Sequence, residues 1–129
     1  MMKIREKEKE TVSALAPYER YKYFIKRVAD TELMYTLKSP DGNWAISEVD
    51  AFKLFPLWSA KGFAEQSKTS GWLIFQVEEI TLETFEDELL EFVHLNGYLL
   101  NVFAVGQNTG FVVDIVELAK DLSEEMKNY

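Results

Sequence analysis

The chain of 129 residues has no cysteine and only one histidine, His94, and these two absences exclude much of the usual side-chain chemistry. Without cysteine there is no disulfide, no thiolate nucleophile and no cysteine-bound zinc site. Any mechanism that needs an imidazole must use His94. None of the serines lies in the Gly-x-Ser-x-Gly pattern of a nucleophile elbow. We therefore predict no catalytic residues and no cofactor.

Long apolar runs are also missing. No stretch approaches the ~18 consecutive apolar residues that a membrane-spanning helix needs. The first residues, Met1-Met2-Lys3-Ile4-Arg5-Glu6, lack the apolar segment of a signal peptide. We therefore expect a cytoplasmic protein with no membrane contact.

What the chain does contain is enough apolar material for one core. Hydrophobic residues make up 47% of the sequence and aromatic residues 14%, which suits a single packed domain at this length. Residues 1–12 alternate Lys or Arg with Glu, and this pattern predicts a charged leader that is either mobile or a frayed extension of the first helix. Residues 13–129 are predicted to form the single domain.

Charge is unevenly distributed along the chain. The net charge is −8. Residues 1–38 hold nine basic and six acidic side chains, a balance of +3, whereas residues 39–129 hold five and sixteen, a balance of −11. An acidic body repels phosphates and so argues against nucleic-acid binding. It suits a basic protein partner.

Hydrophobic periodicity predicts the element order α-β-β-β-α-β-α-β-β-α. The predicted helices cover residues 17–29, 60–67 and 82–95 and a last segment that begins after Asp114, and the predicted strands cover residues 33–38, 44–48, 52–55, 72–77, 99–105 and 111–113. A helix between two apolar strands is a crossover between parallel neighbours, and the short loops at each end predict antiparallel hairpins. We therefore predict the α+β class, with a mixed, mostly antiparallel sheet of about five to six strands and helices packed on it.

Individual residues predict where several elements begin and end. Pro56 cannot donate to a sheet ladder, so it is expected to end the third strand. Ser59, Thr81 and Asp114 each precede an apolar helical pattern and are expected to cap the helices that follow. The segment Ser39-Pro40-Asp41-Gly42-Asn43 has the composition of a tight turn.

Aromatic and turn residues spread over residues 13–128 resemble those of one family. They are Tyr18-Glu19-Arg20-Tyr21 with Phe24, Gly42-Asn43-Trp44-Ala45, Phe55-Pro56-Leu57-Trp58 with Ala64, Trp72, Ile80-Thr81-Leu82 with Phe85, and Val102-Phe103-Ala104-Val105 leading to Gly110. In these residues the chain resembles the small bacterial proteins classed as domain of unknown function 2750. The resemblance implies a bacterial origin and a compact α+β domain, and it carries over no functional residues.

The predicted helix 82–95 carries the candidate partner-binding residues. At 100° per residue its outer side presents Glu83, Asp87, Glu91 and His94. The spacing Glu91-x-x-His94 also occurs in the metal sites of helix bundles, but those sites need several such motifs that face inward. This one faces outward, so we interpret it as a solvated acidic surface with a histidine near the helix C-terminus.

Three functions remain open on this basis. The leading hypothesis is a non-catalytic protein-interaction module with an acidic docking face for a basic protein partner. One alternative is a carboxylate-based metal-dependent enzyme that uses the same acids, or Glu48 and Asp50. Another is a small-molecule-binding protein whose aromatic pocket is rimmed by Trp58 and Trp72. The segment Gly106–Gly110 lacks the Gly-Lys-Ser/Thr ending of a phosphate loop and is interpreted as a hairpin loop.

Overall fold

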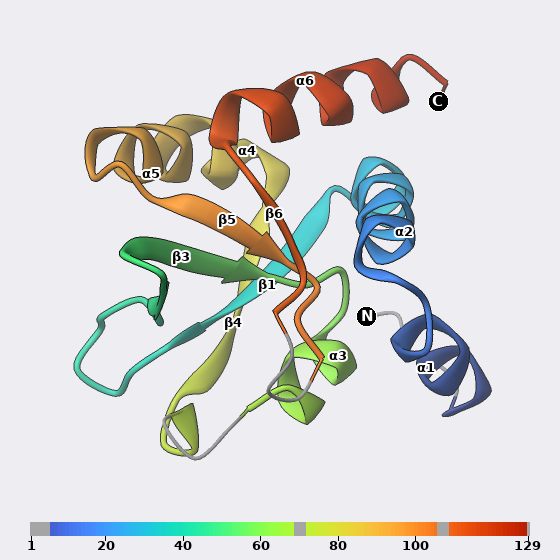
Figure 1. Cartoon of the computed structure of the whole chain (residues 1–129). Coiled ribbons are helices and arrows are strands. Elements are labelled where there is room, and N and C mark those ends of the chain that lie inside the picture. Colours follow the sequence, from blue (N-terminus) through green and yellow to red (C-terminus); the bar gives the residue numbers. More distant parts are fainter. Residues whose placement is uncertain (1–5, 69–71, 106–108, 129) are drawn as a thin grey trace.

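A computed structural model of the chain describes residues 6–68, 72–105 and 109–128 (Figure 1). Its helices are α1 (Glu6–Ser13), α2 (Pro17–Thr31), α3 (Lys61–Gln66), α4 (Leu82–Thr84), α5 (Leu90–Leu95) and α6 (Ile115–Met126), and the π-helical turn η2 (Phe85–Leu89) joins α4 to α5. Its strands are β1 (Leu33–Lys38), β2 (Ser47–Val49), β3 (Phe52–Leu57), β4 (Gln76–Thr81), β5 (Leu99–Val102) and β6 (Phe111–Val113). The described part of the predicted leader forms α1, and residues 1–5 lie outside the described residues.

The strands confirm the α+β class and its mostly antiparallel pairing. They form two small sheets in place of the single sheet predicted: β1 pairs with β4, and the other four follow the order β2-β3-β5-β6. Only the central pair β3 and β5 is parallel among these ladders, as a crossover requires. Tyr35 and Trp58 exchange two backbone hydrogen bonds of 2.8 Å, and this bridge joins the two sheets.

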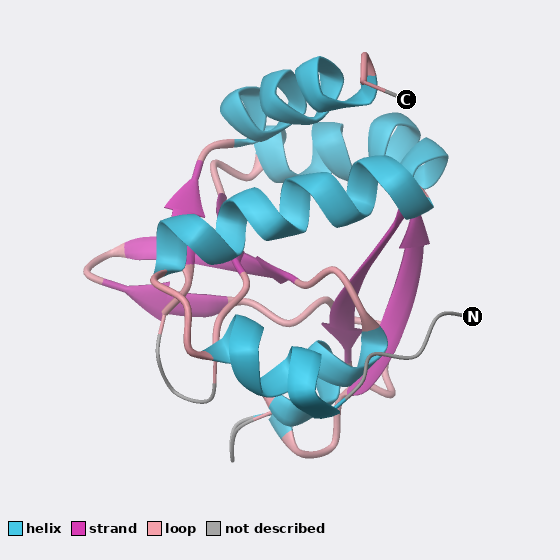
Figure 2. Ribbon diagram, turned by 90° about the vertical axis from the view of Figure 1, so that its right-hand side faces the viewer, coloured by secondary structure: helices cyan, strands magenta, loops and turns pink. Residues whose placement is uncertain are grey.

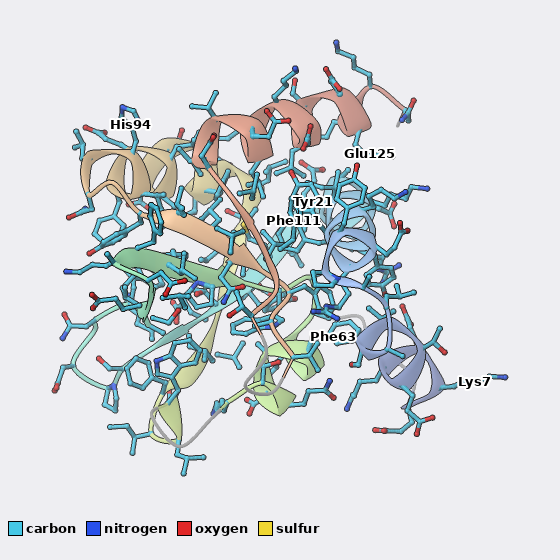
Figure 3. The ribbon with its side chains drawn as sticks, in the orientation of Figure 1. Lys7, Tyr21, Phe63, His94, Phe111 and Glu125 are labelled. Carbon is cyan, nitrogen blue, oxygen red and sulfur yellow. The ribbon has the colours of Figure 1, made fainter. Side chains whose placement is uncertain are left out.

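Two long helices pack against each other beside the strands. In Figure 2, α2 lies in front of the strands and α6 lies above it, at the top of the molecule. The Tyr21 hydroxyl on α2 donates a 2.5 Å hydrogen bond to Asp121 on α6. The Tyr21 ring packs against Phe111 of β6 at a centroid distance of 4.8 Å (Figure 3). No helix among the described residues is long and apolar enough to cross a membrane.

Two of the three predicted helix caps are confirmed, and the third prediction is wrong. Thr81 and Asp114 each accept a hydrogen bond from the backbone N–H three residues later, at 3.1 and 2.8 Å. In contrast, α3 begins after Ala60, which has no side-chain cap, and the buried Ser59 hydroxyl has no hydrogen-bond partner among the described residues. The extended strand continues past Pro56, so Ser59 lies one residue too early to cap the helix.

Pro56 does not end its strand, which corrects a second prediction. It pairs with Asn101 of β5, while β2, on the other side of β3, reaches only as far as Leu54. The Pro56 carbonyl points away from β5 and accepts a 2.6 Å hydrogen bond from the Thr36 hydroxyl. Because the N and the carbonyl of one residue face the same side of a strand, the missing N–H lies where no strand needs a donor.

Three predicted strands are wrong in their bounds. The predicted strand 44–48 is reduced to a bridge between Trp44 and Lys38, and β2 begins only at residue 47. Residues 72–75 precede β4 as a turn, where Leu73 and Ile74 are 68% and 72% exposed. The predicted strand 99–105 ends at residue 102, because the next residue leaves the extended conformation.

That next residue, Phe103, is the centre of a buried polar contact. Its φ of 65° is left-handed. Its N–H donates to the Leu57 carbonyl at 2.8 Å, and its carbonyl accepts a 3.0 Å hydrogen bond from Nε of Arg20. Arg20 is only 6% exposed and also donates to the Leu15 carbonyl. The guanidinium therefore connects α2 and the loop before it to the end of β5.

The residues around this contact are fixed by close packing. The Ala104 carbonyl accepts hydrogen bonds from the indole N–H of Trp58 at 2.9 Å and from the Ser67 hydroxyl at 2.8 Å. Gly110 passes so close that a Cβ on it would lie 2.1 Å from the Val102 carbonyl oxygen. Only glycine fits there.

The hairpin between β2 and β3 carries local strain. Its two turn residues, Asp50 and Ala51, have φ values of 50° and 74°. A two-residue hairpin of this kind needs positive φ at both positions and usually carries Asn-Gly or Asp-Gly. Ala51 has a Cβ where glycine is preferred.

We predict that Arg20→Lys lowers the free energy of unfolding by about 2–3 kcal/mol, because lysine keeps the charge but has one donor nitrogen where the two carbonyls bind two different nitrogens of the guanidinium. Urea denaturation measures the change. The reverse exchange Lys22→Arg, on the exposed side of the same helix, is the control and should leave stability nearly unchanged. A loss below about 0.5 kcal/mol for Arg20→Lys would contradict the structural role of its two hydrogen bonds.

We predict that Ala51→Gly raises the free energy of unfolding by roughly 1 kcal/mol, since it removes the cost of a left-handed Cβ. Denaturation by urea again provides the measurement. Ala60→Gly is the matched control: Ala60 has a φ of −152°, so glycine there relieves no strain and should destabilise the protein. Equal effects of the two variants would show that the turn is not strained.

Candidate functional site

The acidic helix from residue 82 to residue 95 is interrupted by the π turn η2. The N–H of Leu90 bonds to the carbonyl of Phe85, five residues earlier, so this turn holds one residue more than an α-helical turn. The side chains that the helix buries are Leu82, Phe85, Leu89 and Val93. Phe85 and Leu89 are four residues apart, the ordinary spacing of one helix face, and the three acids between them, Glu86-Asp87-Glu88, lie exposed.

All four candidate partner-binding residues lie on the surface of this helix. Glu83, Asp87, Glu91 and His94 are exposed, as the helical periodicity predicts. His94 lies near the end of α5 and points away from the rest of the molecule (Figure 3). Their use in partner binding stays a prediction. We call the exposed acids of this helix, which are Glu83, Glu86, Asp87, Glu88 and Glu91, the acidic face.

The acidic face has no counter-ion of its own. The segment from residue 82 to residue 95 contains no lysine or arginine. The ion pairs between described side chains lie in α1, in α2 and at the end of α3. None of these three ion pairs involves a residue of the acidic face.

The residues of the two alternative functions are placed differently. Trp58 is 0% exposed, and a side chain with no exposed surface cannot rim an open pocket. Trp72 is half-buried and packs beside Phe75, at a ring centroid distance of 6.5 Å. Glu48 and Asp50 are exposed on β2 and its turn. Among the described side chains, no group of three His, Asp or Glu lies close enough to hold a metal ion.

A groove of about 430 Å³, which we call the Trp44 groove, opens beside the acidic face. Its lining residues are Lys38, Trp44, Glu78, Glu79, Ile80, Thr84, Glu88, Leu89 and Phe92. They come from β1, the bridge that follows it, β4 and the helix 82–95. Sequence reasoning missed this groove because it depends on the pairing of β1 with β4, and no local pattern indicates that pairing.

A buried tyrosine lies beside this groove on β1. The Tyr35 hydroxyl donates a 3.0 Å hydrogen bond to Glu79, its partner across the ladder. Burial, together with this hydrogen bond and the charge of Glu79, raises the pKa of Tyr35 to about 12. The contact holds one acid of the groove in place.

Only the end of the segment Gly106–Gly110 is described, since residues 106–108 lie outside the described residues. The described end of the segment, Gly110, donates its N–H to the Asn101 side chain at 2.7 Å. This hydrogen bond holds the backbone in place just before β6 begins at Phe111.

These features define a small α+β domain with one strongly acidic helix. The sequence pattern of the family described as "Protein of unknown function (DUF2750)" matches residues 21–122. Because this match spans most of the chain, the protein belongs to that family, and the resemblance inferred from its aromatic and turn residues is confirmed. No curated protein matches the sequence.

We predict that stability falls as the pH rises above 10. The Tyr35 pKa is higher in the folded protein than the ordinary value of 10, so its contribution is complete below pH 10 and is lost as the pH approaches 12. Urea denaturation between pH 8 and pH 12 measures this loss, and Tyr35→Phe should make it smaller. If the pH dependence of Tyr35→Phe matched that of the wild type, the Glu79 contact would not stabilise the fold.

Proposed function

We propose that this protein is a non-catalytic interaction module that binds a basic protein partner through its acidic face. The observation that carries the proposal is the set of five exposed acids on one short helix with no lysine or arginine among them. Exposed like charges within one helix repel each other and weaken it. A basic partner removes this repulsion on binding.

The chemistry of the acidic face fits a protein partner better than other classes of ligand. Phosphates of nucleic acid or of a lipid surface are repelled by the same charges. Lysine and arginine side chains of a partner gain long-range attraction, which raises the association rate and selects against acidic proteins. Binding of this kind weakens as the salt concentration rises, because salt screens exposed charges.

The proposal predicts that the triple variant Glu83→Lys, Asp87→Lys and Glu91→Lys loses the specific partner. Tagged wild-type and variant proteins serve as baits in a bacterial lysate at low and high salt, and quantitative mass spectrometry compares the captured proteins. We expect at least one basic protein to bind the wild type at low salt, with about tenfold less on the variant. High salt should release it.

A second triple variant controls for net charge. Asp30→Lys, Asp41→Lys and Glu124→Lys change the charge by the same amount at exposed positions outside the acidic face. The control bait should retain the partner. Equal loss on both variants would show that only net charge matters, and capture of the same proteins by all baits would overturn the acidic face as the docking surface.

A further inference from the structure

The Trp44 groove combines aromatic walls with Glu88, which is an acid of the acidic face. Its walls are fixed from behind: Trp44 and Phe92 both pack on the buried Phe55, at ring centroid distances of 5.8 and 6.4 Å. The apolar side chains of Ile80 and Leu89, both buried, also line it. A preformed, apolar hollow of this kind can enclose the stem of one side chain.

Acids from two separate elements surround this hollow. Glu78 on β4 lies opposite Thr36 of β1. Because side chains two residues apart on a strand share a face, Glu78 lies on the same face of the ladder as Lys38 and Ile80. Glu88 comes from the π turn, in the same helix as Thr84 and Leu89. Glu79 also lines the groove, but its carboxylate accepts the Tyr35 hydrogen bond on the opposite face of the ladder, so two carboxylates and one lysine face the hollow, a formal balance of −1.

The groove already holds one cation against its aromatic wall. The Lys38 ammonium lies 4.5 Å from the centroid of the Trp44 ring, within the range of a cation–π contact. In the free chain this ammonium covers part of the indole face, so a cation of the partner must take its place there. The lysine belongs to the chain itself, and it leaves the carboxylates of Glu78 and Glu88 without an ion pair among the described residues.

We propose that the Trp44 groove binds the guanidinium group of an arginine side chain of the partner. This inference rests on the proposed function, because it names the residue type that anchors a basic partner beside the acidic face. Guanidinium is planar and weakly hydrated, so it stacks on an indole while it donates hydrogen bonds to carboxylates. Its aliphatic stem packs on Ile80 and Phe92, which a metal ion or a short ammonium ligand cannot do.

The π turn supports this assignment. Single π turns are frequent at functional sites. Here the turn includes Glu88, which lines the groove, and the buried residues Phe85 and Leu89. The distortion and the hollow therefore occur at the same place in the fold.

The test follows the indole N–H resonances of the protein by NMR during titration with the blocked tripeptide Gly-Arg-Gly. The Trp44 resonance, identified as the one lost in Trp44→Phe, should shift and saturate with a Kd on the order of millimolar. The same tripeptide with citrulline, which has the same shape but no charge, should cause no saturable shift. Glu88→Gln should weaken binding about tenfold, since it removes a charge-assisted hydrogen bond.

Matched variants keep the test specific. Glu91→Gln changes an exposed acid of the same helix that does not line the groove, and it should bind the tripeptide like the wild type. An equal shift with citrulline, or equal weakening by Glu88→Gln and Glu91→Gln, would overturn the groove as a guanidinium site. Spermidine provides a last comparison: if it binds the groove more tightly than the arginine tripeptide, the occupant is a free polyamine and the inference fails.

The groove and the proposed function can fail separately. If the lysate partner depends on Glu83, Asp87 and Glu91 but binds Glu88→Gln as well as the wild type, the groove is overturned and the proposed function stands. If the tripeptide binds the groove while the charge-reversed bait still captures the same proteins, the groove is supported and the acidic docking face is overturned.

Discussion

The hydrogen bond from the buried Arg20 guanidinium to the Phe103 carbonyl is the contact on which the rest of the arrangement depends. It joins α2 to the end of β5, and the same guanidinium holds the Leu15 carbonyl in the loop between α1 and α2. Burial lowers the pKa of Arg20, which reflects the cost of keeping this charge away from water. The cost is offset only while both carbonyls are in place, because an unpartnered charge in the interior is strongly destabilising.

The conformation of Phe103 follows from this contact and determines its neighbours. A left-handed φ costs a residue with a side chain on the order of 1–2 kcal/mol, so the turn persists only because its N–H and its carbonyl both find partners. The turn presents the next carbonyl, that of Ala104, to the indole of Trp58 and the hydroxyl of Ser67. Trp58 therefore lies in the core, although its position at the end of a strand is typical of partly exposed aromatic residues.

The elements that the sequence predicts correctly are those whose causes are local. The caps at Thr81 and Asp114 depend on a side chain and an N–H three residues away, and both are confirmed. The errors at Pro56 and Ser59 have a tertiary cause, because β2 ends early and leaves β3 free to continue past the proline. Likewise, the apolar segment 72–77 resembles a buried strand, yet the ladder with β1 begins only at its fifth residue, Gln76.

The same division applies to the candidate site. Exposure of Glu83, Asp87, Glu91 and His94 follows from helical periodicity and needed no knowledge of the fold. The π turn was not predicted, because a fixed 100° per residue assumes a regular α-helix and the buried residues keep the regular spacing. The groove depends on pairing between segments that are about forty residues apart, which sequence patterns do not encode.

Two features that cost stability occur in the helix from residue 82 to residue 95, and together they support a role for this helix in binding. Five exposed acids with no lysine or arginine in their helix repel one another, and a π turn gives up the regular hydrogen bonding of an α-helix. Neutral substitutions would remove the first cost, and the loss of one residue would remove the second. Natural proteins retain locally unfavourable features mainly where activity or binding needs them. This argument supports the proposal that the acidic face and the Trp44 groove act as one surface, in which charge attracts a basic partner and the groove selects the side chain that anchors it.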